Sequence, residues 1–262
     1  MHVRVPLGTF FIFCVATFGV QAEVAWRTYP QRHFVIYTKD VPQDFVERVK
    51  ERASEYYQEI IDRLGFIGYR GSLESERIKI YIYKNAEEYL EGTRQAHWSH
   101  GSASVRSREI QTFPAAHGFF DSTLPHELGH IIFRDRIGLE AEVPLCFEEG
   151  VAMYQELARR WGAREVIQAA MAQGQFIPFA ELIQMRLSQQ TPRAIVELFY
   201  AESADFIHFL MNAYGQYKFV HLCRKLKEGV GFLEAVDSVY GRDIERIGKA
   251  WEISLSDKES SR

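Results

Sequence analysis

The sequence HELGH at residues 126–130 decides the fold, because its two histidines stand four positions apart. Apolar side chains recur around it at helical spacing, which predicts a helix over residues 122–136. On that helix His126 and His130 lie on one face and can offer two imidazoles to one metal ion. Glu127 lies about 100° round the helix, where it can take a proton from water beside the ion. The motif predicts a metal site with a general base.

A catalytic zinc site usually takes a third protein ligand and keeps one position open for water. Eighteen residues separate His130 from Glu149, which stands in the sequence EEG. That interval lets the first helix end, the chain turn through Gly138, and a second helix start at Pro144. The second helix, expected over residues 144–160, would return a carboxylate to the metal.

With HELGH followed by EEG, the sequence resembles the gluzincin metallopeptidases, and most closely the small peptidase MA-like proteins. The resemblance implies a zincin-like α+β fold and hydrolysis of peptide bonds with Glu127 as general base. It also implies one Zn²⁺ ion held by His126, His130 and Glu149. The thermolysin branch places an aspartate four residues beyond its ligand glutamate, whereas this chain has Met153 there. The resemblance therefore does not say which residue orients the two histidines.

Three further features are less specific. Tyr200, in the sequence FYAES at residues 199–203, resembles the tyrosine that stabilises the oxyanion in aminopeptidase-type relatives, although a core tyrosine fits equally well. The segment 101–104 is expected to form the edge of the cleft, where an extended substrate would pair with it. Glu148 is either a partner of the metal ligands or a solvated charge, and a solvated charge is expected.

Hydrophobic periodicity predicts strands first and helices afterwards. Strands are expected over residues 33–38, 77–83 and 102–113, with helices over 42–64 and 86–93 between them. After the HELGH helix the pattern is helical throughout, and further helices are expected over 144–160, 164–173, 192–214, 217–227, 232–240 and 243–254. The sequence predicts an α+β protein with a small N-terminal mixed β-sheet lobe and a helical C-terminal lobe.

The N-terminus has the pattern of a secretory signal peptide. An uncharged apolar run at residues 7–20 follows the positively charged Arg4 and precedes a predicted cleavage site after Ala22. The alternative, a retained membrane anchor, is disfavoured because a spanning helix needs about 20 apolar residues. We expect a single zincin-like domain over 23–262, with a sheet lobe over about 23–137 and a helical lobe over about 138–262. The mature protein is expected to be secreted or periplasmic, with no stable membrane insertion.

Composition narrows the function classes. The 262 residues carry a net charge of -4, which argues against nucleic acid as a partner and leaves a peptide or protein substrate. Cys146 and Cys223 remain after signal cleavage, and buried free thiols are expected rather than a disulfide. Two functions fit: a secreted zinc peptidase, or a non-catalytic zinc-stabilised binding module of the cell envelope. The presence of Glu127 favours the peptidase, because a purely structural zinc site needs no base.

Overall fold

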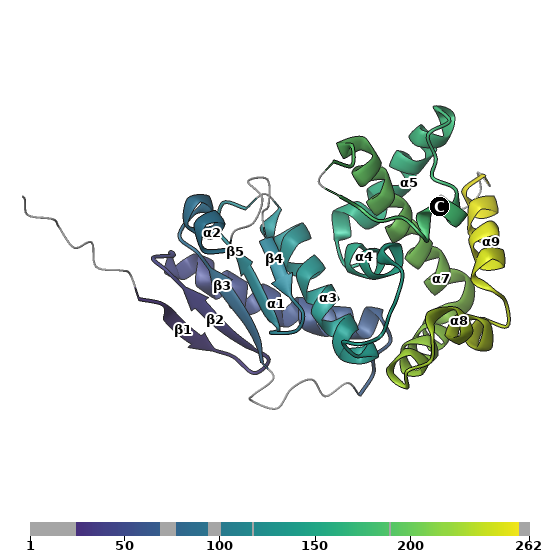
Figure 1. Cartoon of the computed structure of the whole chain (residues 1–262). Helices are drawn as coiled ribbons and strands as arrows, with labels where there is room; N and C mark the ends of the chain where they lie inside the picture. Colours follow the sequence, from purple (N-terminus) through teal and green to yellow (C-terminus); the bar gives the residue numbers. More distant parts are fainter. Residues whose placement is uncertain (1–24, 69–76, 94–100, 117, 189, 257–262) are drawn as a thin grey trace, which may run out of the picture.

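The computed structural model of the chain describes residues 25–68, 77–93, 101–116, 118–188 and 190–256. The predicted signal peptide lies outside these residues. A lobe built on a β-sheet and a lobe of helices lie side by side, as the left and right halves of Figure 1 show. The predicted α+β class, with the sheet first and helices after it, is confirmed.

Within the described ranges, the sheet has five strands in the order β1-β2-β3-β5-β4. Their bounds are β1 Arg27–Pro30, β2 Phe34–Thr38, β3 Ile78–Ile82, β4 Gly101–Ser104 and β5 Glu109–Thr112. The three central strands β2, β3 and β5 run parallel, whereas β1 and β4 pair antiparallel at the two edges. The sheet is therefore mixed, as the sequence predicts, and β4 is an edge strand.

Buried and partly exposed side chains alternate along the central strands, so one face of the sheet is buried. Phe34 and Ile36 of β2 and Ile80 of β3 are fully buried, while the residues between them are partly exposed. Helix α1 (Gln43–Arg63) runs behind the sheet in Figure 1. The ring of Phe34 meets Tyr57 of α1 at 5.7 Å between centroids in an edge-to-face contact. Burial of this apolar face is what fixes the strand register.

The prediction of a single strand over residues 102–113 is wrong, because the chain folds back on itself between β4 and β5. Arg108 adopts a left-handed φ of 56° at this turn. The hydroxyl of Ser107 donates to the hydroxyl of Ser104 at 2.7 Å across it. Serines that hydrogen-bond locally favour turns over strands, and the alternating pattern concealed this signal. Strand β1 and the short helix α6 (Phe179–Leu182) were not predicted.

The helices follow the predicted order with one correction. They are α2 Ala86–Thr93, α3 Leu124–Ile137, α4 Leu145–Met153, α5 Leu157–Ala172, α7 Arg193–Lys227, α8 Phe232–Tyr240 and α9 Ile244–Ser256. The helix expected over 144–160 is wrong, since the chain leaves the helical conformation at Glu156 (φ -76°, ψ 110°). Helix α7 contains a break at Gly215 (φ 80°, ψ 155°), which confirms the predicted division there.

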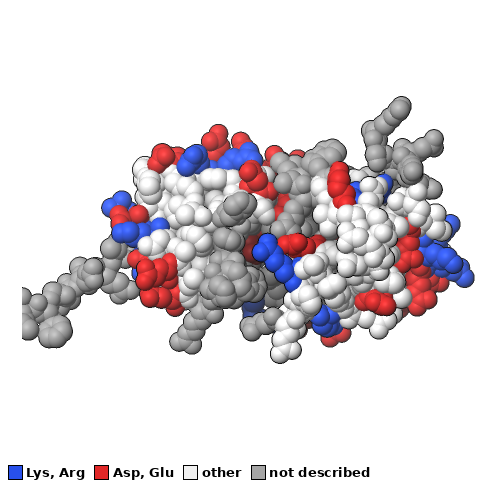
Figure 2. All heavy atoms as spheres, turned by 90° about the horizontal axis from the view of Figure 1, so that it is seen from above, with Lys and Arg blue, Asp and Glu red and all other residues white. Residues whose placement is uncertain are grey.

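The surface charges, the cysteines and the apolar character of the helices are those of an ordinary globular protein. Figure 2 shows acidic and basic side chains dispersed in small groups of both signs over the visible face. Cys146 and Cys223 are both buried and unpaired, as predicted. Among the described residues, no helix has the length and apolar character needed to cross a membrane.

Candidate active site

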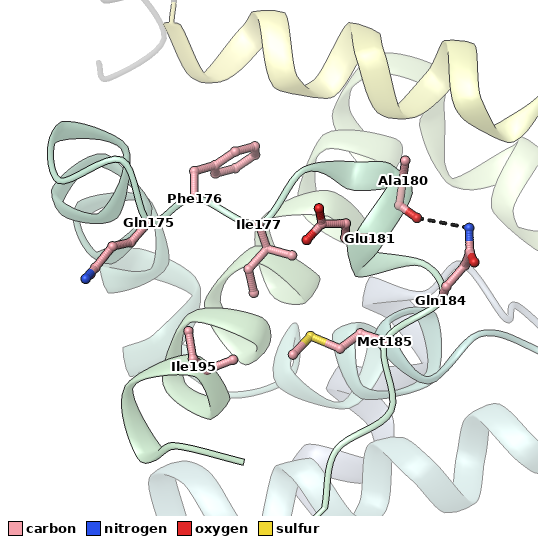
Figure 3. A pocket seen from close by; sticks show the side chains of 8 residues that line it. All are labelled: Gln175, Phe176, Ile177, Ala180, Glu181, Gln184, Met185 and Ile195. Carbon is pink, nitrogen blue, oxygen red and sulfur yellow. Dashed lines mark hydrogen bonds between the residues drawn. The ribbon is translucent and has the colours of Figure 1, made fainter.

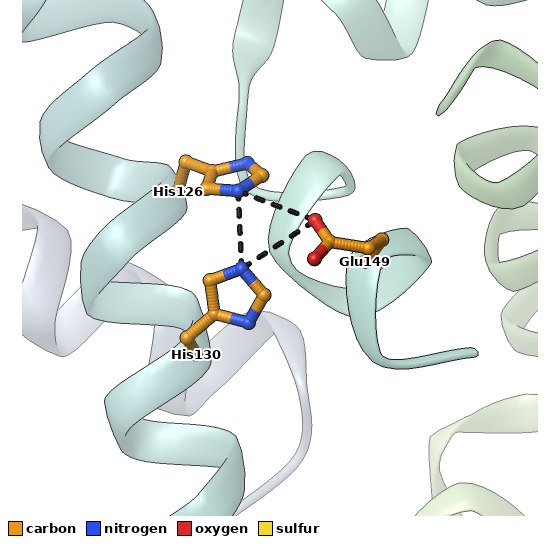
Figure 4. Close-up of side chains that lie close together, drawn as sticks. All are labelled: His126, His130 and Glu149. Atoms are coloured by element: carbon orange, nitrogen blue, oxygen red, sulfur yellow. Dashed lines mark hydrogen bonds and ion pairs between the residues drawn. The ribbon is translucent and has the colours of Figure 1, made fainter. Parts of the chain in front are cut away.

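Helices α3 and α4 bring the three predicted metal ligands together. The Nε2 atoms of His126 and His130 lie 3.1 Å apart. Each of them lies 3.6 Å from Oε2 of Glu149. Figure 4 shows the two imidazoles extending from α3, with their planes nearly perpendicular, and the carboxylate reaching them from α4. The side chains are 13–17% exposed, so the cluster is shielded but open to one side.

The donor set and its spacing fit a zinc ion. Three ligands at 2.0–2.1 Å from a tetrahedral zinc lie about 3.3 Å from one another. The three measured separations, 3.1, 3.6 and 3.6 Å, bracket that value. Two imidazole nitrogens and one carboxylate oxygen are also the ligand types of catalytic zinc sites that leave a fourth position open. Among the described residues, no other group of three such side chains converges in this way.

The same proximity sets the charge state of the ligands. Burial lowers the pKa of His126, but the carboxylates of Glu149 and Glu156 outweigh it and raise this pKa to about 10. Burial raises the pKa of Glu149, yet the two imidazoles bring it well below its ordinary value. A metal ion requires neutral imidazole and ionised carboxylate, so it competes with protons for these groups.

Glu156 orients His126, and sequence reasoning missed it. Its Oε1 lies 2.8 Å from Nδ1 of His126, on the side of the ring away from the other ligands. The hydroxyl of Ser122 donates to the other oxygen of Glu156. A carboxylate behind a metal-binding histidine fixes its tautomer and ring orientation. The signal was present in the sequence as a glutamate seven residues after Glu149, but on a continuous helix over 144–160 it would lie two turns, about 10.5 Å, further along the axis than Glu149.

We predict that Glu156→Gln weakens zinc binding about tenfold, because the carboxylate that polarises His126 becomes a neutral amide. Competition with a chromophoric chelator measures this affinity. The matched control is Glu142→Gln, which changes an exposed glutamate in the turn between α3 and α4 and should leave zinc affinity unchanged. Equal zinc affinities for both variants would contradict the orienting role.

Glu148 is not the solvated charge that was expected. It pairs with Arg134 through both oxygens, one of them 2.7 Å from Nε, and both side chains are at most 20% exposed. Arg134 also donates to the carbonyl of Ala141 at 2.7 Å. Arg134 stands one helical turn after His130 and Glu148 stands directly before Glu149, so this ion pair joins the two helices that hold the metal ligands.

Gly150 allows α4 to approach α7 closely. A Cβ atom at Gly150 would lie 2.4 Å from the backbone oxygen of Ser203 and 2.8 Å from Cγ1 of Ile207. The first of these is a backbone atom, which cannot move without displacing the helix. The glycine of the EEG sequence is therefore explained by packing beside the ligand Glu149.

We predict that Gly150→Ala lowers the free energy of unfolding by about 2–3 kcal/mol, because overpacking forces the two helices apart. Urea denaturation measures the change. Gly162→Ala is the matched control, since a Cβ there meets no atom within 4 Å. That control should be neutral or stabilise the protein by up to about 1 kcal/mol, as alanine favours the helix. Equal stability of the two variants would be inconsistent with the close contact.

The remaining predicted site residues lie on α3, on α7 and on the edge strand β4. Glu127 is partly exposed on α3, and burial raises its pKa, against the opposing effect of His126 and His130. Tyr200 is partly buried on α7, one turn before Ser203, the residue that Gly150 contacts. Edge strand β4 lies against the start of α3, since a Cβ at Gly101 would be 2.4 Å from Thr123.

A mixed sheet, an HExxH helix and a returning glutamate together define a zincin-like fold of the metallopeptidase type. The sequence profile of the Peptidase MA superfamily matches residues 65–257. The chain belongs to this superfamily. A search of curated protein sequences gave no match.

Solved structures of yeast LTA4 hydrolase are similar to the chain in fold. The native enzyme aligns with a TM-score of 0.53 at 15% identity, over 88% of this chain and 39% of the hydrolase. The complex of that enzyme with bestatin aligns with a TM-score of 0.52 at 15% identity, over 89% of this chain and 38% of the hydrolase. The chain thus spans well under half the length of these structures. The predicted zincin-like fold is confirmed.

Proposed function

We propose that the protein is a secreted zinc-dependent peptidase. The observation that carries this proposal is the convergence of His126, His130 and Glu149 at the spacing of a zinc site, with Glu127 beside them. Membership of the Peptidase MA superfamily supports the same reaction class. Secretion rests on the N-terminal sequence pattern, which ends at Ala22.

Each of these residues has a separate role in the proposed reaction. A zinc ion held by the two histidines and Glu149 would supply Lewis acidity, which lowers the pKa of water and polarises a carbonyl group. Glu127 is the general base that accepts the proton of the attacking water and later passes it to the leaving amine.

We assign stabilisation of the oxyanion to Tyr200, which lies on the helix that α4 packs against. Tyr200→Phe is expected to lower kcat about 100-fold, since one hydrogen-bond donor to the developing charge is lost. The substitution should leave zinc content unchanged, as the phenol is not a metal ligand. Steady-state kinetics with metal analysis measure both quantities. A phenylalanine variant with the parent kcat would show that Tyr200 is a core residue.

The proposed function is tested with the purified chain from residue 23 onward. Metal analysis is expected to find one zinc per chain, and a mixed peptide library is expected to be cleaved. A chelator should abolish cleavage, and added zinc should restore it. Stoichiometric zinc without cleavage of any peptide or protein would contradict the peptidase and support a zinc-stabilised binding module.

A further inference from the structure

The helical lobe contains a cavity that the metal site does not use. Its volume is about 590 Å³, and it lies where α6 and its flanking loops meet the first turn of α7. The lining residues are Gln175, Phe176, Ile177, Ala180, Glu181, Gln184, Met185 and Ile195. Figure 3 shows the apolar side chains gathered around an open centre, with the carboxylate of Glu181 directed into it.

The cavity and the metal site lie on different faces of α7. Ile195 lines the cavity, and Glu202, seven residues later, occupies nearly the same face of the helix. Ser203 faces α4, where Gly150 packs against it. Tyr200 lies about 140° round the helix from Ile195 but only about 7.5 Å further along its axis. The cavity and α4, which carries Glu149, therefore contact α7 at different positions round its axis.

The wall of the cavity is held in place by two carboxylates, of which Glu202 is buried and Glu252 partly buried. Oε1 of Glu202 accepts a hydrogen bond from the backbone N–H of Ile177 at 3.0 Å. Oε1 of Glu252 accepts one from the backbone N–H of Phe179 at 2.7 Å. Both bonds fasten the segment that turns into α6 onto α7 and α9. The cavity is thus a preformed feature of the lobe and not a gap between mobile loops.

Among the residues that line the cavity, Glu181 alone is charged. No cation among the described residues pairs with Glu181, whose carboxylate is exposed at the cavity. Glu202, Glu252 and Asp205 lie behind the wall, and burial raises the pKa of Glu202 to about 8 with help from the other two. Arg164 lies 3.4 Å from Asp205. A site with apolar walls and an unpaired carboxylate favours a ligand that is both apolar and cationic.

We propose that this cavity binds a peptide segment in which a lysine or arginine stands beside apolar residues. Ile177, Met185 and Ile195 would contact the apolar side chains, and Glu181 would pair with the cation. Under the proposed peptidase function the segment belongs to the substrate, several residues from the bond that is cleaved. The cavity then selects basic, apolar substrates at a distance from the metal.

The proposal is tested by binding, with the Glu127→Gln protein as the parent so that the peptide is not consumed. Fluorescence anisotropy compares a labelled peptide that has a lysine between leucines with the same peptide carrying glutamate instead. The lysine peptide should bind more tightly. Adding Glu181→Gln should weaken its binding about two- to fivefold, as expected for a partly exposed ion pair. Adding Ile195→Ser should weaken it about tenfold or more through lost apolar contact.

Matched controls are Glu234→Gln and Leu233→Ser on α8, both exposed and outside the cavity, which should leave the affinity unchanged. Thermal melting verifies that each variant is folded. A chelator should not remove the dependence on Glu181, because the cavity contains no metal ligand. Equal affinity for the lysine and glutamate peptides, or no effect of either cavity variant, would overturn the proposal. Cavity-dependent binding by a protein that cleaves no peptide would instead count against the peptidase function alone.

Discussion

Replacing Glu127 with glutamine is expected to lower kcat by about 10⁴-fold while zinc remains bound. The glutamine side chain keeps the shape and position of the glutamate but cannot accept a proton. General-base catalysis contributes about 10²–10⁴-fold in enzymes, and we expect a loss at the upper end of that range. Zinc should remain, because the metal cluster consists of His126, His130 and Glu149 without Glu127. Hydrolysis of a library-derived peptide and metal analysis of the same sample give both values.

Glu142→Gln serves as the matched control for this prediction, since it removes one exposed carboxylate from the turn between α3 and α4. Its kcat should equal that of the parent. Full activity of Glu127→Gln with stoichiometric zinc would refute the role of Glu127 as base. Loss of zinc from that variant would instead place Glu127 among the ligands and require a different reading of the HELGH sequence.

The metal cluster was predictable from sequence because local geometry determines most of it. Two histidines four apart share a helix face, and this relation holds in any α-helix. The segment between His130 and Glu149 also contains residues that typically end and start helices. Gly138 ends α3, and Pro144 precedes α4. The choice of Glu149 over Glu148 came from the resemblance to the gluzincins, and the rest of the ligand assignment needed one long-range assumption, that α4 returns to α3. The order of strands and helices was predictable for the same reason, because the spacing of apolar residues depends only on residues close together in the sequence.

The residues that sequence reasoning missed depend on tertiary contacts. Glu156 lies near His126 only because the chain leaves the helix there and the carboxylate turns back to α3. In this conformation Glu156 contacts both Ser122 and His126. Glu148 finds Arg134 across the interface between two helices, which no spacing along the chain reveals. These contacts appear only when the packing of α3 against α4 is known.

Replacing Glu149 with alanine is expected to weaken zinc binding about 100-fold or more and to abolish hydrolysis when free zinc is scarce. Binding of zinc by four ligands stabilises small sites by about 10–16 kcal/mol, so one ligand accounts for roughly 3 kcal/mol. Two imidazoles 3.1 Å apart would remain, without the carboxylate that neutralises the ion. Zinc-buffered titration measures the affinity, and activity should return in part as free zinc is raised.

Glu148→Gln is the most informative control, because it changes the neighbouring carboxylate on the same helix. That substitution weakens the ion pair with Arg134, so it should lower the free energy of unfolding by about 1–3 kcal/mol. Its zinc affinity should stay close to that of the parent, since Glu149 is unchanged. Substitution of Glu149 is thus expected to lower zinc affinity, whereas substitution of Glu148 is expected to lower stability. If Glu148→Gln lost zinc while Glu149→Ala retained it, the third ligand would be the other glutamate and α4 would be rotated from its position here.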